Sequence, residues 1–569
     1  MPLTLAVSTL ALCATTWTAA QAAAQRINFE PCPGLNANIS ALTGIPGTPF
    51  DCAQLLVPLD YTNSQSPSLN LSLFRVNATE EPVLGSVLIN FGGPGGTGAE
   101  NLPVVAEEAR KNIGAQWDLV SWDPRGTGYT IPFNCSIATM VATDPTAQKR
   151  DLGTLAGINL TEVFLTSGWD TAGQTADFCF EQVGHETGTL IGTAFVARDM
   201  MEIVDALGED GLLRFYGWSY GTALGSYAAA MFPERIERMV LDANLNPHDY
   251  QSGTYRDLTT DTDEAFAGFL EACFNVTDDC ALYSLVQPNT TQDLLDVLNS
   301  VLKPLAQNAT LSAEAFQTYF ALKSIFIEPL YYPTTWPSFA QTLVNLLTET
   351  PNPSESDPSP PVYGEAELAL LGIRASDATF HANSSDEYLP IVEYTSQVSP
   401  SFSDLFNSLW PSARWRMPAK ERYWGDFQAT TKTPILFING MFDPATPIVG
   451  AYNASAGFEG SVVLPHSGYG HGIFVSPSEC VAEHIRAYFQ NGSLPSGNVS
   501  CAPDMTPVEL WRSIVQESTG NSTSESNGNS TTNGNGAAED VEGGASAWKS
   551  SLTLAITAGV LAVAVANVL

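Results

Sequence analysis

Ser219 stands between two glycines in the run Gly217-Trp218-Ser219-Tyr220-Gly221, which has the form G-x-S-x-G. The apolar segment "LLRFY" leads into this run and the alanine-rich segment "ALGSYAAAM" follows it, so the pattern predicts a strand, a sharp turn and a helix. A serine on such a turn holds its hydroxyl above the sheet, at the N-terminus of the helix. We therefore predict that Ser219 is a catalytic nucleophile.

A serine hydroxyl attacks a carbonyl efficiently when a base removes its proton and a carboxylate orients that base. On a strand-turn-helix nucleophile the acid and then the base follow the serine in chain order. Asp443 in "FINGMFDPATP" and His471 in "HSGYGHGIF" each follow a predicted strand, and we predict that they are this acid and this base. His466 is an alternative base, and Asp242 in "VLDAN" is an alternative acid that we interpret first as structural.

The attack creates an oxyanion, which needs N–H donors that are in place beforehand. We predict that one donor is the amide of Tyr220, directly after the nucleophile. The other lies in "NFGGPGGTG", where Gly92 and Gly93 let the backbone approach the substrate. This glycine spacing matches neither of the common phosphate-binding patterns, which argues against a nucleotide site. Asp123 and Arg125 in "WDPRGTG" are expected to brace this loop through a buried ion pair.

A short apolar segment precedes each group of candidate site residues, and each of these segments ends at glycine, proline or a polar residue. Helical patterns such as "TAFVARDMMEIVDALG" lie between them. This alternation predicts an α/β fold with a mostly parallel sheet, helices on both faces, and functional residues at the carboxyl ends of the strands. Residues 30 to 80 are expected to add edge strands. The predicted inner strands lie in "VLGSVLINF", "QWDLVSWD", "GLLRFYGWS", "RMVLDAN", "TPILFING" and "GSVVLPHSGY".

Residues 251–424 break this rhythm. They contain helical stretches such as "DEAFAGFLEACF" and "TWPSFAQTLVNLLTE", and the Pro/Ser-rich stretch "TPNPSESDPSPP". We interpret them as an inserted, mainly helical cap with at least one exposed linker. The hydrolytic core would then consist of residues 25–250 and 425–510.

Five motifs, "FGGPGG", "WDPRGTG", "GWSYG", "NGMFDPATP" and "GYGHG", occur in this order. Together they resemble the prolyl iminopeptidase and tripeptidyl aminopeptidase branch of the α/β-hydrolases. The resemblance covers about residues 50–250 and 425–505, and the second part is similar to the TAP-like C-terminal region of that family. It implies the α/β-hydrolase fold and the triad and oxyanion hole described above. Relatives often have histidine before the Gly-Gly-Pro-Gly motif, where this chain has Phe91.

The two ends of the chain have the composition of targeting segments. Residues 1–24 are apolar, uncharged and end in small residues, which is typical of a secretory signal peptide. Residues 511–551 are expected to be a disordered Ser/Asn/Gly-rich linker, and residues 552–569 are apolar with no Lys or Arg after them. This arrangement favours a GPI-attachment signal over a plain membrane anchor. Candidate attachment residues are Asn535, Gly536 and Gly543.

Cysteine usage agrees with secretion. Eight cysteines remain once Cys13 leaves with the signal peptide, and an even number in an oxidising compartment predicts four disulfides. Several connectivities are possible, and we predict pairing between neighbours in the sequence. There is no C-x-x-C spacing, so a zinc or redox site is not expected. The chain also has fourteen N-x-S/T sequons, which indicate a glycosylated surface. The predicted pairs are Cys32–Cys52, Cys135–Cys179, Cys273–Cys280 and Cys480–Cys501.

We expect a secreted or cell-surface serine hydrolase that removes residues from peptide N-termini through an acyl-enzyme, without a metal or cofactor. The formal charge of −37, with only 23 Lys and Arg, argues against nucleic acid as a partner. An aminopeptidase needs carboxylates for the substrate's ammonium group, and "DLTTDTDEAF" and "SSDEYLP" contain candidates. The alternatives are an esterase or amidase that uses the same triad on ester or N-blocked substrates, and an inactive surface protein that only binds.

Overall fold

The fold is built on one sheet. The computed structural model describes residues 26–43, 47–135, 155–309, 313–348 and 365–520. Within these ranges nine strands form a sheet in the order β1-β2-β3-β5-β4-β6-β7-β8-β9. Strands β1 to β3 pair antiparallel at one edge, and all pairs from β5 to β9 are parallel. The strands are β1 (Glu30–Pro31), β2 (Asp51–Pro58), β3 (Ser68–Val76), β4 (Gly85–Asn90), β5 (Trp117–Trp122), β6 (Leu213–Trp218), β7 (Ile236–Asp242), β8 (Leu436–Phe442) and β9 (Val462–Tyr469).

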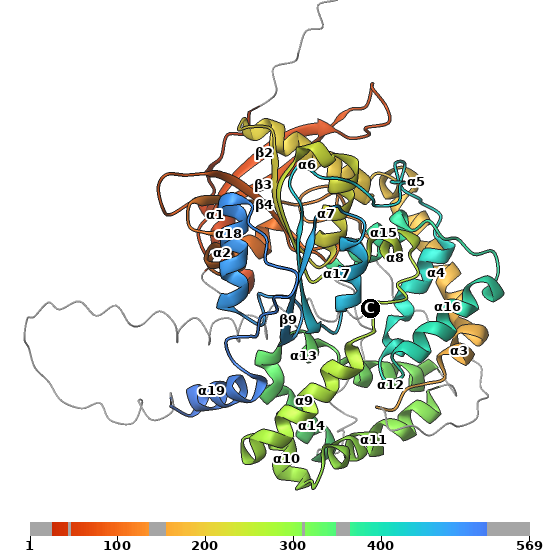
Figure 1. Ribbon diagram of the computed structural model, residues 1–569. Helices are drawn as coiled ribbons and strands as arrows, with labels where there is room; N and C mark the ends of the chain where they lie inside the picture. The colour runs from red at the N-terminus through yellow and green to blue at the C-terminus, as the bar shows by residue number, and fades with distance from the viewer. Residues whose placement is uncertain (1–25, 44–46, 136–154, 310–312, 349–364, 521–569) are drawn as a thin grey trace, which may run out of the picture.

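Helices cover both faces of this sheet, because the inner strands are apolar on both sides and must be shielded twice. Helices α2 and α18 pack together against one face, and α6 and α7 pack against the other (Figure 1). The predicted α/β class, mostly parallel sheet and edge strands from residues 30–80 are confirmed, and the structure adds that these edge strands pair antiparallel. The helices of the core are α1 (Pro33–Thr43), α2 (Gly98–Ile113), α5 (His185–Gly188), α6 (Thr193–Leu207), α7 (Tyr220–Met231), η2 (Pro233–Arg235), α17 (Ile448–Ser455) and α18 (Glu479–Asn491).

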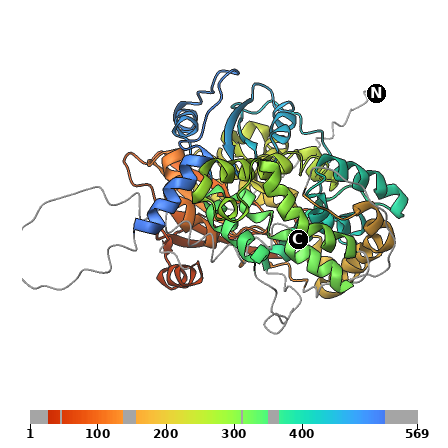
Figure 2. The same ribbon diagram turned by 90° about the horizontal axis from the view of Figure 1, so that it is seen from below.

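A layer of helices covers the carboxyl ends of the parallel strands. The chain enters this layer after β7 and returns to the sheet at β8, the strand next to β7. We call these helices the cap; Figure 2 shows them, largely in green, in front of the sheet. They are α8 (Pro247–Ser252), α9 (Thr262–Val276), η3 (Thr277–Asp279), α10 (Ala281–Val286), α11 (Thr291–Asn308), α12 (Ala313–Ser324), α13 (Glu328–Tyr331), η4 (Pro333–Thr335), α14 (Trp336–Thr348), α15 (Glu365–Asp377), α16 (Ser385–Val398) and η5 (Ser403–Arg414).

Two further pieces of chain pack on the cap although they lie outside residues 251–424. The first is α3 (Leu160–Val163), η1 (Phe164–Gly168) and α4 (Trp169–Val183), where the Phe164 ring lies 5.0 Å from that of Trp410 in η5. The second is α19 (Pro507–Gly520), where Trp511 is buried and stacks on Phe269. The prediction that a linker starts at residue 511 is therefore wrong. The apolar side of α19 supplies enough buried surface to order the chain up to residue 520.

The four disulfides among the described residues join cysteines that are neighbours in the sequence: Cys32–Cys52, Cys135–Cys179, Cys273–Cys280 and Cys480–Cys501. The predicted pairing is confirmed. The predicted signal peptide, the apolar tail and the candidate GPI-attachment residues lie outside the described residues. Among the helices that are described, we find none that combines the length and the apolar character needed to cross a bilayer.

Candidate active site

Ser219 lies on the sharp turn between β6 and α7. Its φ of 57° and ψ of −123° are strained for a residue other than glycine. The flanking glycines are required by close backbone contacts: a Cβ at Gly217 would lie 2.3 Å from the Gly221 carbonyl oxygen, and a Cβ at Gly221 would lie 2.7 Å from the Asn90 carbonyl oxygen. The strand, turn and helix predicted from the G-x-S-x-G pattern are therefore confirmed.

Asp443 and His471 lie together at the carboxyl ends of β8 and β9. His471 Nδ1 is 3.0 Å from both carboxylate oxygens of Asp443. The Asp443 side chain is fully buried and also accepts hydrogen bonds at 2.9 Å from the backbone amides of Ala445 and Thr446 and from the Thr446 hydroxyl. A carboxylate in this position fixes the imidazole tautomer, leaving Nε2 to act as the base.

The His471 loop is tied to the nucleophile turn and to the cap. The indole Nε1 of Trp218, the residue before the serine, donates to the His471 carbonyl oxygen at 3.2 Å, and their rings lie 5.6 Å apart. On the cap side, the His471 amide donates to the Tyr331 carbonyl oxygen at 3.0 Å, and the two rings lie 5.1 Å apart. Within the described chain the Ser219 hydroxyl forms no hydrogen bond to the imidazole. Bonds of this kind often form only once substrate is bound.

The glycine loop after β4 lies directly against the nucleophile turn. A Cβ at Gly92 would lie 2.5 Å from the Trp218 carbonyl oxygen and 3.0 Å from the Tyr220 amide nitrogen, so only glycine permits this approach. The Gly92 amide already donates to the Asn90 side chain at 3.1 Å. The amides of Gly93 and Tyr220 have no acceptor among the described residues. Gly92 therefore provides space rather than a free N–H, which corrects the prediction for that residue.

Asp123 and Arg125 do not form the predicted ion pair, and of the two only Asp123 hydrogen-bonds to the end of the glycine loop. Arg125 pairs with Asp199 of α6 instead, with Nε 2.6 Å from Oδ2 and both side chains fully buried. The Asp123 carboxylate accepts the amides of Gly98, at the start of α2, and Tyr129, each at 2.9 Å. Burial raises the pKa of Asp123 to about 6. The prediction of that particular pair is wrong, because the guanidinium reaches across to a helix that the motif does not contain.

The alternative base, His466, belongs to the sheet. It lies within β9, and its Nδ1 accepts the Gly468 amide at 3.2 Å. Burial lowers its pKa to about 4, so the ring is neutral at ordinary pH. Its Nε2 is buried without a partner in the described structure. Since no contact joins it to Ser219 or to Asp443, His471 is the better candidate for the base.

The alternative acid, Asp242, lies behind the candidate triad at the end of β7. One oxygen accepts the Tyr216 hydroxyl at 2.9 Å and the Ile473 amide at 3.0 Å. Burial, together with the nearby negative charge of Asp443, raises its pKa to about 7. Asp242 thus anchors the loop that carries His471, and its hydrogen bonds support the structural interpretation.

Two charged side chains near the site were not singled out from any motif. Arg374 of α15 donates from Nη2 to the Gly93 carbonyl oxygen at 3.0 Å and has no carboxylate partner among the described residues. Asp261, at the start of α9, accepts the Ile448 amide at 3.2 Å. Burial raises its pKa to about 6, and the negative charge of Asp443 adds to that effect. Asp261 lies in the acidic segment noted in the sequence, whereas no local pattern distinguishes Arg374.

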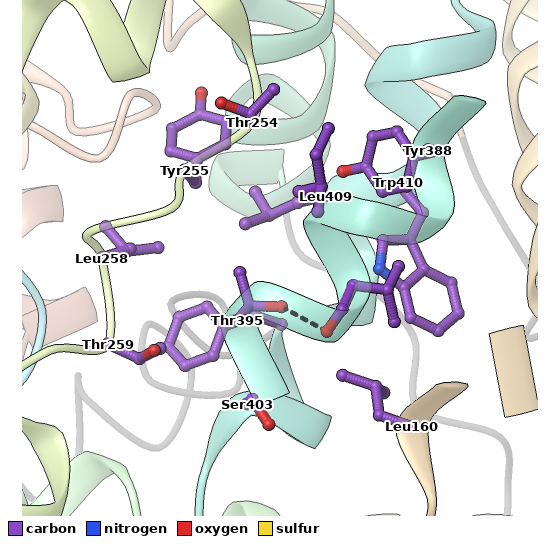
Figure 3. A pocket seen from close by; sticks show the side chains of 13 residues that line it. Leu160, Thr254, Tyr255, Leu258, Thr259, Tyr388, Thr395, Ser403, Leu409 and Trp410 are labelled. Atoms are coloured by element: carbon purple, nitrogen blue, oxygen red, sulfur yellow. Dashed lines mark hydrogen bonds between the residues drawn. The ribbon is translucent and has the colours of Figure 1, made fainter. Parts of the chain in front are cut away.

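A small cavity lies inside the cap, separate from Asp443 and His471. Figure 3 shows Tyr255 and Leu258 on one wall and Tyr388 and Trp410 on the other. The Tyr255 and Thr259 hydroxyls are buried without partners in the described structure. The cavity volume of about 20 Å³ is close to that of one or two water molecules. It is too small for a substrate side chain, so we place the reacting group at the strand ends instead.

Family comparisons agree with this geometry. The family described as alpha/beta hydrolase fold matches residues 85–288, and the family described as TAP-like protein matches residues 402–501. The chain is an α/β-hydrolase with a TAP-like C-terminal region. The TAP-like match begins inside the predicted cap, before β8, so it includes the helix η5 that packs against α4.

Curated relatives align with most of the hydrolase. A tripeptidyl aminopeptidase of Streptomyces coelicolor is 26% identical and covers 86% of this chain and 88% of that protein. The serine protease Hip1 of Mycobacterium tuberculosis is 25% identical, and the match covers 84% of this chain and 91% of that protein. A carboxylesterase B of the same species is 26% identical and covers 79% and 86%. Among solved structures, esterase E22 is 13% identical, with a TM-score of 0.32, and covers 77% of this chain and 100% of that one. The curated relatives place the hydrolase in the serine hydrolase and peptidase class and relate it to tripeptidyl aminopeptidases.

Proposed function

We propose that the hydrolase is a serine exopeptidase that removes residues from peptide N-termini. The observation that carries this proposal is the Asp443–His471 pair, held against the turn of Ser219 by the bond from Trp218. A buried acid, an imidazole and a serine on a strained turn form the arrangement that activates a hydroxyl for acyl transfer.

The proposed reaction proceeds in two steps. His471 Nε2 takes the proton of Ser219 as Oγ attacks the carbonyl carbon, and Asp443 stabilises the imidazolium. The amides of Gly93 and Tyr220 donate to the oxyanion. The tetrahedral intermediate collapses when His471 passes its proton to the leaving amine, leaving an acyl-serine. Water, deprotonated by the same imidazole, then attacks the acyl carbon, and the acid is released as His471 returns this proton to the Ser219 oxygen.

Recognition of a free N-terminus requires a carboxylate near the site without a cation of its own. Asp261 meets this requirement, since it forms no ion pair among the described residues and its pKa is affected by the charge of Asp443. We propose that it receives the substrate's ammonium. Asp386 and Glu387, in the other acidic segment, are exposed in the first turn of α16. The relatives named as tripeptidyl aminopeptidases support an N-terminal specificity.

The proposed nucleophile is tested with a fluorophosphonate probe on the purified protein. Wild type should be labelled, and Ser219→Ala should not, while Ser226→Ala on the same helix should be labelled like wild type. Both variants are compared by circular dichroism to show that they are folded. A folded wild-type protein that resists the probe would show that the hydrolase is an inactive binding protein.

The leading alternative, an esterase or amidase for blocked substrates, is favoured by the relative named carboxylesterase B. Free-amine tripeptide arylamides, their N-acetylated counterparts and aryl esters separate the two. The exopeptidase should prefer the free amine at least tenfold in kcat/KM. Asp261→Asn should lower that preference without lowering hydrolysis of the acetylated substrate. Cleavage of the blocked substrates alone would contradict the exopeptidase.

We also propose that the protein is secreted and held at the cell surface by a GPI anchor. The four disulfides support an oxidising compartment. The terminal sequences that suggest a signal peptide and an anchor lie outside the described residues. Treatment of intact cells with a phosphatidylinositol-specific phospholipase should release the protein into the medium, and retention on the cells would contradict the anchor.

A further inference from the structure

Helix α15 of the cap contacts the loop that carries one proposed oxyanion donor. Arg374 donates from Nη2 to the carbonyl oxygen of Gly93 at 3.0 Å. About two turns closer to the N-terminus of the same helix, the Ala366 carbonyl oxygen lies so close to Gly95 that a Cβ on Gly95 would be 2.4 Å from it. The helix thus fixes both the position of the glycine loop and the plane of the peptide that follows Gly93.

The same helix also reaches the residue that carries the other proposed donor. Asp377 accepts the Thr193 amide at 2.9 Å and the Thr193 hydroxyl at 2.5 Å. Because that hydroxyl uses its only O–H to donate to the carboxylate, it accepts a hydrogen bond from the Tyr220 hydroxyl, 2.7 Å away. The Tyr250 hydroxyl is a third donor to Asp377, at 2.7 Å. All four side chains are buried, so the network lies away from water and is held in one arrangement.

Arg374 and Asp377 are three residues apart and lie on one side of a single helical turn. One rigid element therefore holds the loop of Gly93 and the ring of Tyr220 together. The two amides come from strand ends that are far apart in the sequence, and neither has an acceptor among the described residues to hold it. A shift of about 1 Å in an active site can lower the rate by about a hundredfold.

We infer that α15 is the element that sets the spacing of the oxyanion hole, with Arg374 and Asp377 as positioning residues for the amides of Gly93 and Tyr220. This inference rests on the proposed serine-hydrolase mechanism but not on the exopeptidase specificity. It makes the cap part of the catalytic geometry and not only a cover over the substrate, because a displacement of α15 would move both donors relative to Ser219.

The decisive experiment compares Arg374→Ala, Arg374→Lys and the matched control Arg422→Ala. Arg422 donates to the Ala378 carbonyl at the end of the same helix, at 3.0 Å, and does not contact the glycine loop. Arg374→Ala should lower kcat about tenfold or more while KM changes less than about threefold, on an aryl ester and on an arylamide alike. Arg374→Lys should recover part of kcat, and Arg422→Ala should stay within about twofold of wild type.

A second measurement separates a positioning role from a general loss of structure. Affinity for a peptide trifluoromethyl ketone, which forms a tetrahedral adduct on the serine, should fall in Arg374→Ala by the same factor as kcat/KM. Tyr220→Phe, which removes the bond to Thr193, should show the same proportionality. Unchanged kcat in Arg374→Ala, or unchanged affinity for the ketone, would overturn the inference. A wild type that turns over neither substrate would instead refute the proposed function.

Discussion

The indole of Trp218 donates a hydrogen bond to the backbone carbonyl of His471, which joins the residue before the proposed nucleophile to the loop of the proposed base. The contact crosses from β6 to the end of β9, two strands that are not neighbours in the sheet. It is a direct hydrogen bond between the two halves of the proposed catalytic arrangement. We therefore expect the alignment of His471 to depend on it.

Trp218→Phe removes this N–H donor and keeps an aromatic ring next to Phe474 and His471. A neutral hydrogen bond contributes about 1 kcal/mol, so we expect kcat to fall about fivefold with a small change in melting temperature. Trp424→Phe is the control, because Trp424 is 70% exposed. Equal kcat in the two variants would show that the indole bond does not align the base.

Thr446 is expected to hold Asp443 in place. Its hydroxyl donates to Asp443 Oδ2 at 2.9 Å and lies 3.3 Å from His471 Nδ1. Thr446→Val keeps the shape and loses the donor to a buried carboxylate, so we expect kcat to fall about tenfold. Thr446→Ser should recover most of the rate in the same steady-state assay. Failure of serine to restore activity would assign the effect to packing.

Asp242→Asn should flatten the dependence of stability on pH. Burial raises the folded-state pKa of Asp242 from 3.8 to about 7, so between these values the folded protein holds a proton that the unfolded chain has lost. Stability is therefore lost as the pH rises through this window. Asparagine can still accept from Tyr216 and Ile473 without carrying a proton that titrates. Melting temperatures at pH 5 and pH 8 should differ less in Asp242→Asn than in wild type.

The control for that comparison is Asp386→Asn, at an exposed position in the cap. It should lose as much stability as wild type between the two pH values. If the melting temperatures of wild type and Asp242→Asn changed equally between pH 5 and pH 8, the buried carboxyl would not titrate in this range.

The buried pair of Arg125 and Asp199 is expected to dominate the stability of the loop after β5. Both side chains are fully buried, and Arg125→Met leaves the carboxylate without its cation. We expect a loss of about 3 to 5 kcal/mol in the free energy of unfolding by urea. The adjacent Arg198 pairs with Glu421 at the surface, so Arg198→Met should cost less than about 1 kcal/mol. Similar losses of unfolding free energy in the two variants would contradict the expectation that the buried pair contributes more to stability than the surface pair.

The sequence by itself determined the features that depend on neighbouring residues. The turn at Ser219 follows from its two flanking glycines, because a side chain at Gly217 or Gly221 would clash with the backbone. Asp443 and His471 could be proposed because parallel strands bring their carboxyl ends to one edge. The disulfides followed from pairing neighbours along the chain, such as Cys273 and Cys280 at a sequence separation of 7.

Only the tertiary structure decided the contacts that join distant segments. Arg125 pairs with Asp199, 74 residues away, and Arg374 meets Gly93 across 281 residues. The Gly92 amide is taken by the Asn90 side chain, which the glycine pattern could not show because it depends on a side-chain rotamer. Local sequence patterns indicate turns and the apolar faces of helices and strands. The partner of a buried charge depends instead on how the helices pack in the tertiary structure. That is why the residues of the proposed triad could be named from the sequence, whereas the contacts of α15 with the proposed oxyanion hole could not.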